Sequence, residues 1–199
     1  LNDPQREAVG APAGPMLVLA GAGSGKTRVL TYRIAYLVQA LEVSPYAILA
    51  VTFTNKAANE MRKRIEDFLG FSVRGMWIGT FHGLSHRILR DHHELAGLPK
   101  GFEILDSDDQ YRVIRRALKE LNLDEGYWPP RQIQWFINSQ KEEGRRAVQV
   151  QDNGDSHQQT LIRVYTHYEE TCQRLGLVDF AELLLRTLEL LEQTPSLLE

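Results

Sequence analysis

The sequence predicts an α/β fold: a partial P-loop domain built on a parallel sheet, followed by a domain made of helices. Three observations predict it. Short apolar runs alternate with amphipathic helical patterns over the first 80 residues. A glycine-rich loop joins the first apolar run to the first helical pattern. From about residue 82 onward, the apolar spacing is helical almost throughout.

Three strands are expected in the first part, because each is a short continuous apolar run typical of a strand buried on both faces. They are residues 16–20, 48–53 and 76–79. Helices are expected after the first two, one from about Gly25 and one from Asn55 to Leu69. Three strands are few for a nucleotide-binding sheet, so we expect a piece of a larger domain.

Five helices are expected in the second part: residues 82–95, one around 114–121, 129–144, one around 161–175, and 180–191. The polar stretch 149–158 has a central Asn-Gly and is predicted to be a loop. We place the boundary so that residues 1–85 form the first part of the P-loop domain and residues 86–199 form the helical domain.

Composition excludes several classes of protein. Hydrophobic residues make up 43% and charged residues 25%, which is typical of a globular chain with a buried core. The single cysteine, Cys172, cannot form an internal disulfide and favours a reducing, cytoplasmic setting. No apolar run is long enough to span a bilayer and no signal peptide pattern is present, so no membrane partner is expected. With a net charge of −3, any contact with DNA must use a local groove.

The strongest motif is a phosphate loop, made of Ala20, Gly21, Ala22, Gly23, Ser24, Gly25, Lys26 and Thr27. Its glycines let successive backbone N–H groups point into one concavity at the start of a helix. Lys26 supplies a charge for the β- and γ-phosphates, and Thr27 offers a hydroxyl to Mg²⁺. A plain glycine-rich turn is the alternative, which the strand-loop-helix context disfavours. The motif predicts binding of a nucleoside triphosphate with Mg²⁺.

Three further stretches decide the subclass: Leu1–Val9 (LNDPQREAV), Val51–Ala58 (VTFTNKAA) and Ile78–Leu84 (IGTFHGL). With the phosphate loop, they resemble the first four signature motifs of UvrD/Rep-type superfamily 1 DNA helicases, in order and spacing. The helical part, including LDSDDQ at 105–110 and LVDFAEL at 177–183, resembles the insertion that these helicases carry in their first RecA-like domain.

The resemblance implies an ATP-dependent DNA helicase that unwinds from 3′ to 5′ and serves DNA repair or replication. It implies ATP and Mg²⁺ as cofactors, with Lys26 and Thr27 as catalytic residues of the phosphate loop. The implied partners are single-stranded DNA, the junction of single- and double-stranded DNA, and repair or replication proteins.

The resemblance also assigns Gln5 to the adenine base and Arg28 to a position beside it. The chemistry agrees, because a glutamine amide has one acceptor and two donors and can pair with adenine through two hydrogen bonds. A surface helix residue is the alternative for Gln5.

The resemblance further implies that six residues at the ends of the second and third strands bind single-stranded DNA. An aromatic ring can stack on a base while small polar groups hold phosphate, and ligands bind at this edge of an open α/β sheet. The alternative is that the two phenylalanines are core and that the polar residues cap helices. The six residues are Phe53, Thr54, Asn55, Thr80, Phe81 and His82.

Other candidates receive structural interpretations. Asp106, Asp108 and Asp109 are predicted to cap a helix and not to bind a cation. Three histidines on a helix lack metal-ligand partners, and four aromatics are predicted to lie in the helical core. A basic cluster could contact duplex phosphate or pair with a helix end, and both readings stay open. These residues are, in that order, His86, His92 and His93; Tyr127, Trp128, Trp135 and Phe136; and Lys141, Arg145 and Arg146.

The carboxylates that P-loop ATPases need for Mg²⁺ and for the attacking water are missing. In the family they form an Asp-Glu pair after a buried strand, and here no Asp-Glu follows four apolar residues. Asp179 and Glu182 are the residues most similar to this pair, but Asp179 stands where a helix N-cap is expected. We therefore expect a fragment that does not itself unwind DNA. A P-loop ATPase or kinase unrelated to DNA, and a pure interaction module, remain open as other classes.

Overall fold

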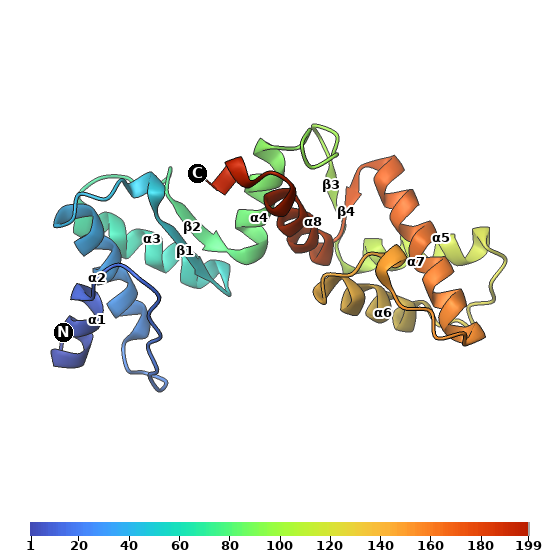
Figure 1. Ribbon diagram of the computed structural model, residues 1–199, viewed down its shortest axis with the longest axis horizontal. Coiled ribbons are helices and arrows are strands. Elements are labelled where there is room, and N and C mark those ends of the chain that lie inside the picture. The colour runs from blue at the N-terminus through green and yellow to red at the C-terminus, as the bar shows by residue number, and fades with distance from the viewer. Residues whose placement is uncertain (199) are drawn as a thin grey trace. The chain divides into compact units, whose positions relative to one another are not determined.

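The computed structural model describes residues 1–198 and has a mixed α/β architecture with small parallel sheets. It divides into two compact units, Leu1–Leu84 and Ser85–Glu199, and the chain passes from one to the other within helix α4 (Phe81–Asp91). Figure 1 shows the order of the elements along the chain. Within residues 1–198, no helix is both long and apolar enough to cross a bilayer.

The first unit holds a two-stranded parallel sheet covered by helices. Strand β1 pairs with strand β2 in a register that runs from Leu49↔Trp77 to Thr52↔Thr80. Its core is formed by side chains from the helices and both strands, including Ile34, Met61 and Ile65. The elements are α1 (Asp3–Gly10), α2 (Lys26–Gln39), η1 (Pro45–Ala47), β1 (Leu49–Thr52), α3 (Asn55–Leu69) and β2 (Trp77–Thr80).

Helix α3 shows how the local sequence sets its own ends. Thr54 is its N-cap and accepts a hydrogen bond from the backbone N–H of Ala57 at 3.2 Å. At the other end, Gly70 adopts a left-handed φ of 75°, the conformation that most often terminates a helix. The predicted bounds of this helix, residues 55–69, are confirmed.

The predicted strand at residues 16–20 is wrong. This segment lies in an extended loop without regular secondary structure, between α1 and α2 (Figure 1). Its side chains are exposed, with Leu17 at 82% and Leu19 at 85%. A strand needs a hydrogen-bonded neighbour, and in residues 1–84 strand pairing is confined to β1 and β2. The apolar run thus marks a potential strand for which this structure provides no partner.

The second unit is mainly helical, as predicted, with two short strands that the sequence did not reveal. Strands β3 and β4 pair in parallel over two residues each. One core lies among α5, α6 and α7 around Ile114, Ile133 and Tyr165, and another joins α4 to α8 through Leu89 and Leu183. The elements are α4, β3 (Glu103–Ile104), α5 (Ser107–Glu120), α6 (Pro130–Glu142), η2 (Ala147–Gln149), α7 (Ser156–Leu175), β4 (Leu177–Val178), α8 (Phe180–Gln193) and η3 (Pro195–Leu198).

Two expected boundaries in this unit shift. Helix α4 ends at Asp91, so His92 and His93 lie in the turns that follow it. Helix α7 begins at Ser156, inside the stretch predicted to be a loop, because Asp155 caps it by accepting hydrogen bonds from the next backbone N–H groups. The capping role predicted for Asp106 is confirmed, since its carboxylate accepts from the N–H groups of Asp108 and Asp109 at 2.8 Å.

A buried ion-pair network crosses this unit. The ammonium of Lys141 lies 2.7 Å from Asp179 and 2.9 Å from Glu182, with all three side chains at most 5% exposed. Arg146 reaches Glu182 at 2.7 Å and Glu189 at 2.5 Å. Burial opposes ionisation, yet Lys141 and Arg146 hold the pKa of Glu182 well below its usual range. The network ties α6 and the following loop to α8.

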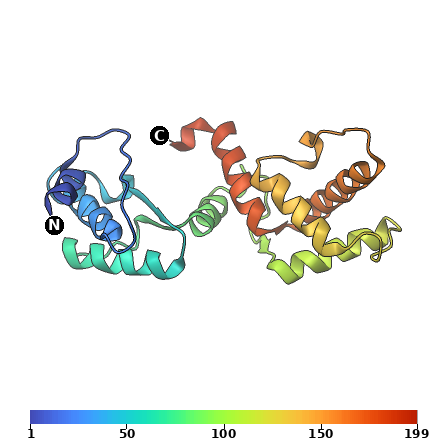
Figure 2. The same ribbon diagram turned by 90° about the horizontal axis from the view of Figure 1, so that it is seen from below.

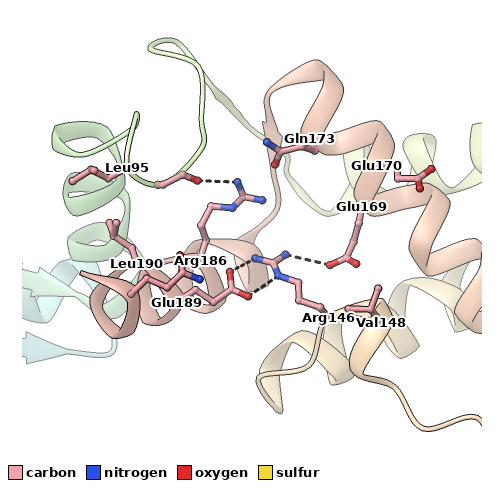
Figure 3. Close-up of a pocket in the computed structure, with 11 residues that line it drawn as sticks. Leu95, Arg146, Val148, Glu169, Glu170, Gln173, Arg186, Glu189 and Leu190 are labelled. Carbon is pink, nitrogen blue, oxygen red and sulfur yellow. Dashed lines mark hydrogen bonds and ion pairs between the residues drawn. The ribbon is translucent and has the colours of Figure 1, made fainter. Parts of the chain in front are cut away.

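The network shows what two residues of the predicted basic cluster contact, which the sequence left open. Lys141 and Arg146 are committed to buried carboxylates and do not present a phosphate-binding surface. Figure 3 shows Arg146 bonded to Glu189 and Glu169, and Arg186 beside them, in a pocket of about 430 Å³. Both arginines in that pocket are paired with carboxylates.

Of the four aromatic residues predicted to lie in the helical core, two are in it and two are exposed. Trp128 is buried and Phe136 packs against the α5–α7 core, as predicted. Tyr127 and Trp135 are each 73% exposed, so the prediction that they are core is wrong. They stand beside a pocket of about 460 Å³ that Trp128 also lines. Helical spacing alone does not distinguish the buried aromatic neighbours from the exposed ones.

Candidate nucleotide and DNA sites

The phosphate loop has the backbone geometry that an anion site requires. Gly23 and Gly25 adopt left-handed φ values of 74° and 84°, which other residues rarely adopt. Ser24 closes a turn onto the carbonyl oxygen of Gly21, donating from its backbone N–H at 3.4 Å and from its hydroxyl at 2.7 Å. Gly25 is the N-cap of α2 and offers no side-chain cap. The first N–H groups of this 14-residue helix are therefore without a capping side chain, and the helix dipole favours an anion there.

Lys26 and Arg28 flank this helix start. The ammonium of Lys26 donates to the carbonyl oxygens of Ala20 at 2.9 Å and Gly21 at 2.6 Å, folding its charge back over the loop. The guanidinium of Arg28 lies 5.6 Å from the ring centroid of Tyr32, within cation–π range. Because Lys26 is exposed, its long side chain can exchange carbonyl partners for phosphate oxygens without burying a new charge.

Gln5 lies against the same loop. Its side-chain nitrogen donates to the carbonyl oxygen of Ser24 at 3.0 Å. Its side-chain oxygen accepts from the backbone N–H of Asn2 at 3.0 Å, completing a capping box at the start of α1. A Cβ added to Gly25 would stand 3.1 Å from the Gln5 nitrogen, so the two positions are closely packed. The structure thus brings Gln5 to the phosphate loop, with both amide atoms in hydrogen bonds that a bound base would replace.

The ends of β1 and β2 place two aromatic rings side by side. Thr52 and Thr80 are in register, and Phe53 and Phe81 follow them directly. The ring centroids are 6.0 Å apart with an interplanar angle of 47°. Phe53 is 90% exposed and Phe81 is 50% exposed, so the alternative that Phe53 is core is wrong for this structure.

The polar neighbours support the helix-capping alternative in part. Thr54 caps α3, and the hydroxyl of Thr80 accepts from the N–H of Gly83 at 3.1 Å. Asn55 is the first residue of α3, and both Asn55 and His82 are exposed. These residues surround the two rings at one edge of the sheet. The structure therefore brings the six predicted DNA residues together at that edge.

The phosphate loop and this edge are not joined by the sheet. A strand at residues 16–20 in the same parallel sheet would bring the phosphate loop beside the ends of β1 and β2. In the described part of the chain, residues 16–20 pair with neither β1 nor β2. The nucleotide residues around the phosphate loop and the DNA residues around Phe53 and Phe81 are therefore two clusters that no strand pairing joins.

Asp179 and Glu182, the nearest likeness to the catalytic Asp-Glu pair, belong to neither cluster. Asp179 accepts from the N–H of Glu182 as the N-cap of α8, as predicted, and its carboxylate also meets Lys141 and the hydroxyl of Tyr168. These bonds use its oxygens inside the second unit. Among residues 1–198, no group of three His, Cys, Asp or Glu side chains is placed to hold a metal ion.

Sequence reasoning missed one residue beside the nucleotide cluster. Arg33 of α2 donates to the carbonyl oxygens of Val9, Ala11 and Pro12, which precede it by 24, 22 and 21 positions. The local pattern does not mark it, because its partners are backbone atoms distant in sequence.

Comparison with known proteins identifies the family. The model of the UvrD/REP helicase N-terminal domain matches residues 1–199. The chain belongs to this family. It is 60% identical over 199 residues to DNA helicase II of Salmonella typhimurium and of Escherichia coli, covering 100% of this chain and 28% of each relative. It is 46% identical over 202 residues to the ATP-dependent DNA helicase PcrA of Leuconostoc citreum, covering 100% of this chain and 27% of that protein.

These relatives carry the helicase resemblance across every part of the chain, the helical unit included. The chain spans between a quarter and a third of their length. Family membership disfavours the alternative of a kinase unrelated to DNA, since these relatives are named as DNA helicases.

Proposed function

We propose that this chain is the ATP-binding, N-terminal portion of an ATP-dependent DNA helicase that moves along single-stranded DNA and unwinds duplex DNA from 3′ to 5′ in repair or replication. Residues 1–85 are the first part of its RecA-like domain, and residues 86–199 are the helical insertion. The working protein acts in the cytoplasm at the junction of single- and double-stranded DNA, together with repair or replication proteins.

The nucleotide half of the proposal rests on the start of α2. Two left-handed glycines, an uncapped helix N-terminus and an exposed lysine provide N–H groups and a charge for a triphosphate. Lys26 then binds the β- and γ-phosphates, and Thr27 contributes its hydroxyl to Mg²⁺. Gln5 and Arg28 both lie close to Gly25 at this helix start, which supports their assignment to the base.

The DNA half rests on one observation, the exposed pair of rings at Phe53 and Phe81. A phenylalanine that is 90% exposed contributes little to a core and is available for stacking. Two rings 6.0 Å apart, set among Thr54, Asn55 and Thr80, suit bases with their phosphates beside them. A small-molecule kinase has no use for such an edge.

Hydrolysis requires a carboxylate that orients water and a metal shell beyond one threonine hydroxyl. The carboxylate of Asp179 is buried in the second unit, where it pairs with Lys141. We therefore propose that these 199 residues bind nucleotide without turning it over.

Calorimetry of ATP·Mg²⁺ binding tests the nucleotide half. Lys26→Ala should weaken binding by about 2–4 kcal/mol, the effect of removing a preorganised charged group from its target oxygens. Lys63→Ala is the matched control, because Lys63 is an exposed lysine on α3 with no part in the loop. Equal affinity in wild type and Lys26→Ala would show that the loop does not bind the phosphates.

A further inference from the structure

Helix α1 buries few of its own side chains. It has eight residues, and Val9 is its one buried side chain. A helix this short is marginal in water without tertiary contacts. It packs against its neighbour α2, beside which it lies in both views (Figures 1 and 2), and polar ties join the two helices as well.

Those ties lie at the two ends of α1. At its start, Gln5 bonds to the carbonyl oxygen of Ser24, one residue before the cap of α2. At its end, the guanidinium of Arg33 donates to the carbonyl oxygen of Val9 at 2.7 Å, to that of Ala11, and to that of Pro12 at 3.4 Å.

The chemistry of the second tie is specific to arginine. The last carbonyl groups of a helix lack intrahelical partners and carry its negative dipole. Helix α1 has no basic residue in its own last turn, so Arg33 supplies that cation from α2. A planar guanidinium can spread several donors over neighbouring carbonyl groups, whereas a lysine ammonium acts as a point charge.

We propose that Arg33 is a positioning residue for the base of the bound nucleotide. Helix α2 carries the phosphate-binding N–H groups at its start and Arg33 further along. Because α1 is tied to this helix at both ends, Arg33 fixes where Gln5 stands relative to the phosphates. Arg33 thus favours adenine nucleotides over phosphate alone while touching neither. This inference rests on the proposed contact between Gln5 and adenine.

The test compares ADP with inorganic pyrophosphate, which shares the phosphate contacts but has no base. Affinities for both are measured by calorimetry in wild type, Gln5→Ala, Arg33→Ala and the double variant. Gln5→Ala should weaken ADP binding about tenfold, the loss expected for one or two neutral hydrogen bonds, and leave pyrophosphate unchanged. Arg33→Ala should give a loss of about the same size for ADP alone, and the double variant should lose no more than either single one.

Two further variants separate positioning from stability. Arg33→Lys keeps the positive charge but loses the planar guanidinium with its several donors. It should still lose ADP affinity, while its melting temperature stays near that of wild type. Arg62→Ala is the matched control, because Arg62 is a partly buried arginine that donates to the carbonyl oxygen of Ile78 at 2.7 Å, away from α1. It should keep the preference for ADP.

The outcomes distinguish the two claims. If Gln5→Ala leaves ADP binding unchanged, the proposed adenine contact fails and the role of Arg33 fails with it. If Gln5→Ala acts but Arg33→Ala and Arg33→Lys keep the wild-type preference for ADP, only the role of Arg33 is overturned. Equal losses for ADP and pyrophosphate in both Arg33 variants, or additive losses in the double variant, would overturn it as well.

Discussion

Replacing Phe53 with alanine separates a DNA-stacking ring from a core ring. A buried phenylalanine typically costs about 3–5 kcal/mol of stability when it is truncated to alanine. Phe53 is 90% exposed, and its nearest ring, Phe81, is 6.0 Å away between centroids. The substitution should therefore change the free energy of unfolding by no more than about 0.5 kcal/mol, as for other surface positions.

The same substitution should be costly for DNA. Losing one base stack costs about 1–3 kcal/mol, which corresponds to a factor of about 5–150 in Kd. The assay is the anisotropy of a labelled single-stranded oligothymidylate in the full-length protein, at one fixed salt concentration because phosphate contacts depend strongly on salt. Thermal unfolding of the same samples provides the stability measurement.

Phe71→Ala is the matched control for Phe53→Ala. Phe71 is 47% exposed and lies between α3 and β2, before the strand begins and away from the edge where Phe53 follows β1. It should leave DNA affinity unchanged. Phe53 is not a stacking ring if Phe53→Ala lowers the melting temperature as a core truncation does, or if the variant binds DNA as tightly as wild type.

Four further predictions concern the rest of the chain. Glu182→Gln leaves the buried Lys141 short of a partner and should cost about 3–5 kcal/mol in urea unfolding, whereas Glu60→Gln, at an exposed pair, should cost at most about 1 kcal/mol. The pKa of Glu182 is lower in the folded protein than its ordinary value of 4.5, so its charge stabilises the fold above pH 4.5. This stabilisation should be lost as the pH falls below 4.5 toward the folded pKa. Acid unfolding of wild type, compared with that of Glu182→Gln, measures the loss. Gly25→Ala places a side chain in a left-handed conformation and 3.1 Å from the nitrogen of Gln5, so calorimetry should show weakened ADP binding. The 199-residue chain should hydrolyse no ATP above background with or without DNA, and robust DNA-stimulated turnover by it would show that the catalytic groups are present.

Local signals predicted most of the fold. The caps at Thr54, Asp106 and Asp179 fix where helices begin, and each is a short polar side chain that bonds to backbone two or three residues ahead. The strands that became β1 and β2 were placed within a residue or two, since each is a short apolar run next to a helix signal.

Nonlocal features escaped prediction. Residues 16–20 have the composition of a buried strand, but whether they form one depends on a pairing partner elsewhere. Strands β3 and β4 are two residues long, and no apolar period marks so short a segment. The burial of Lys141 likewise depends on carboxylates that α8 brings to it from 38 positions away.

The candidate sites also contain features that local sequence predicts and features that depend on distant residues. The phosphate loop is local in sequence, so its glycines and lysine were found directly. The meeting of Phe53 with Phe81 was predictable because parallel strands in register end at one edge. Arg33 was not, because its three partners are backbone carbonyl groups that no side-chain pattern records.

The most direct test of the central claim is ATP hydrolysis by the full-length protein, measured while single-stranded DNA is titrated in. Our account predicts a rate that rises with DNA and saturates, and that falls to background in Lys26→Ala at every DNA concentration. A wild-type rate that is the same with and without DNA would contradict the claim that these residues belong to a DNA-coupled ATPase.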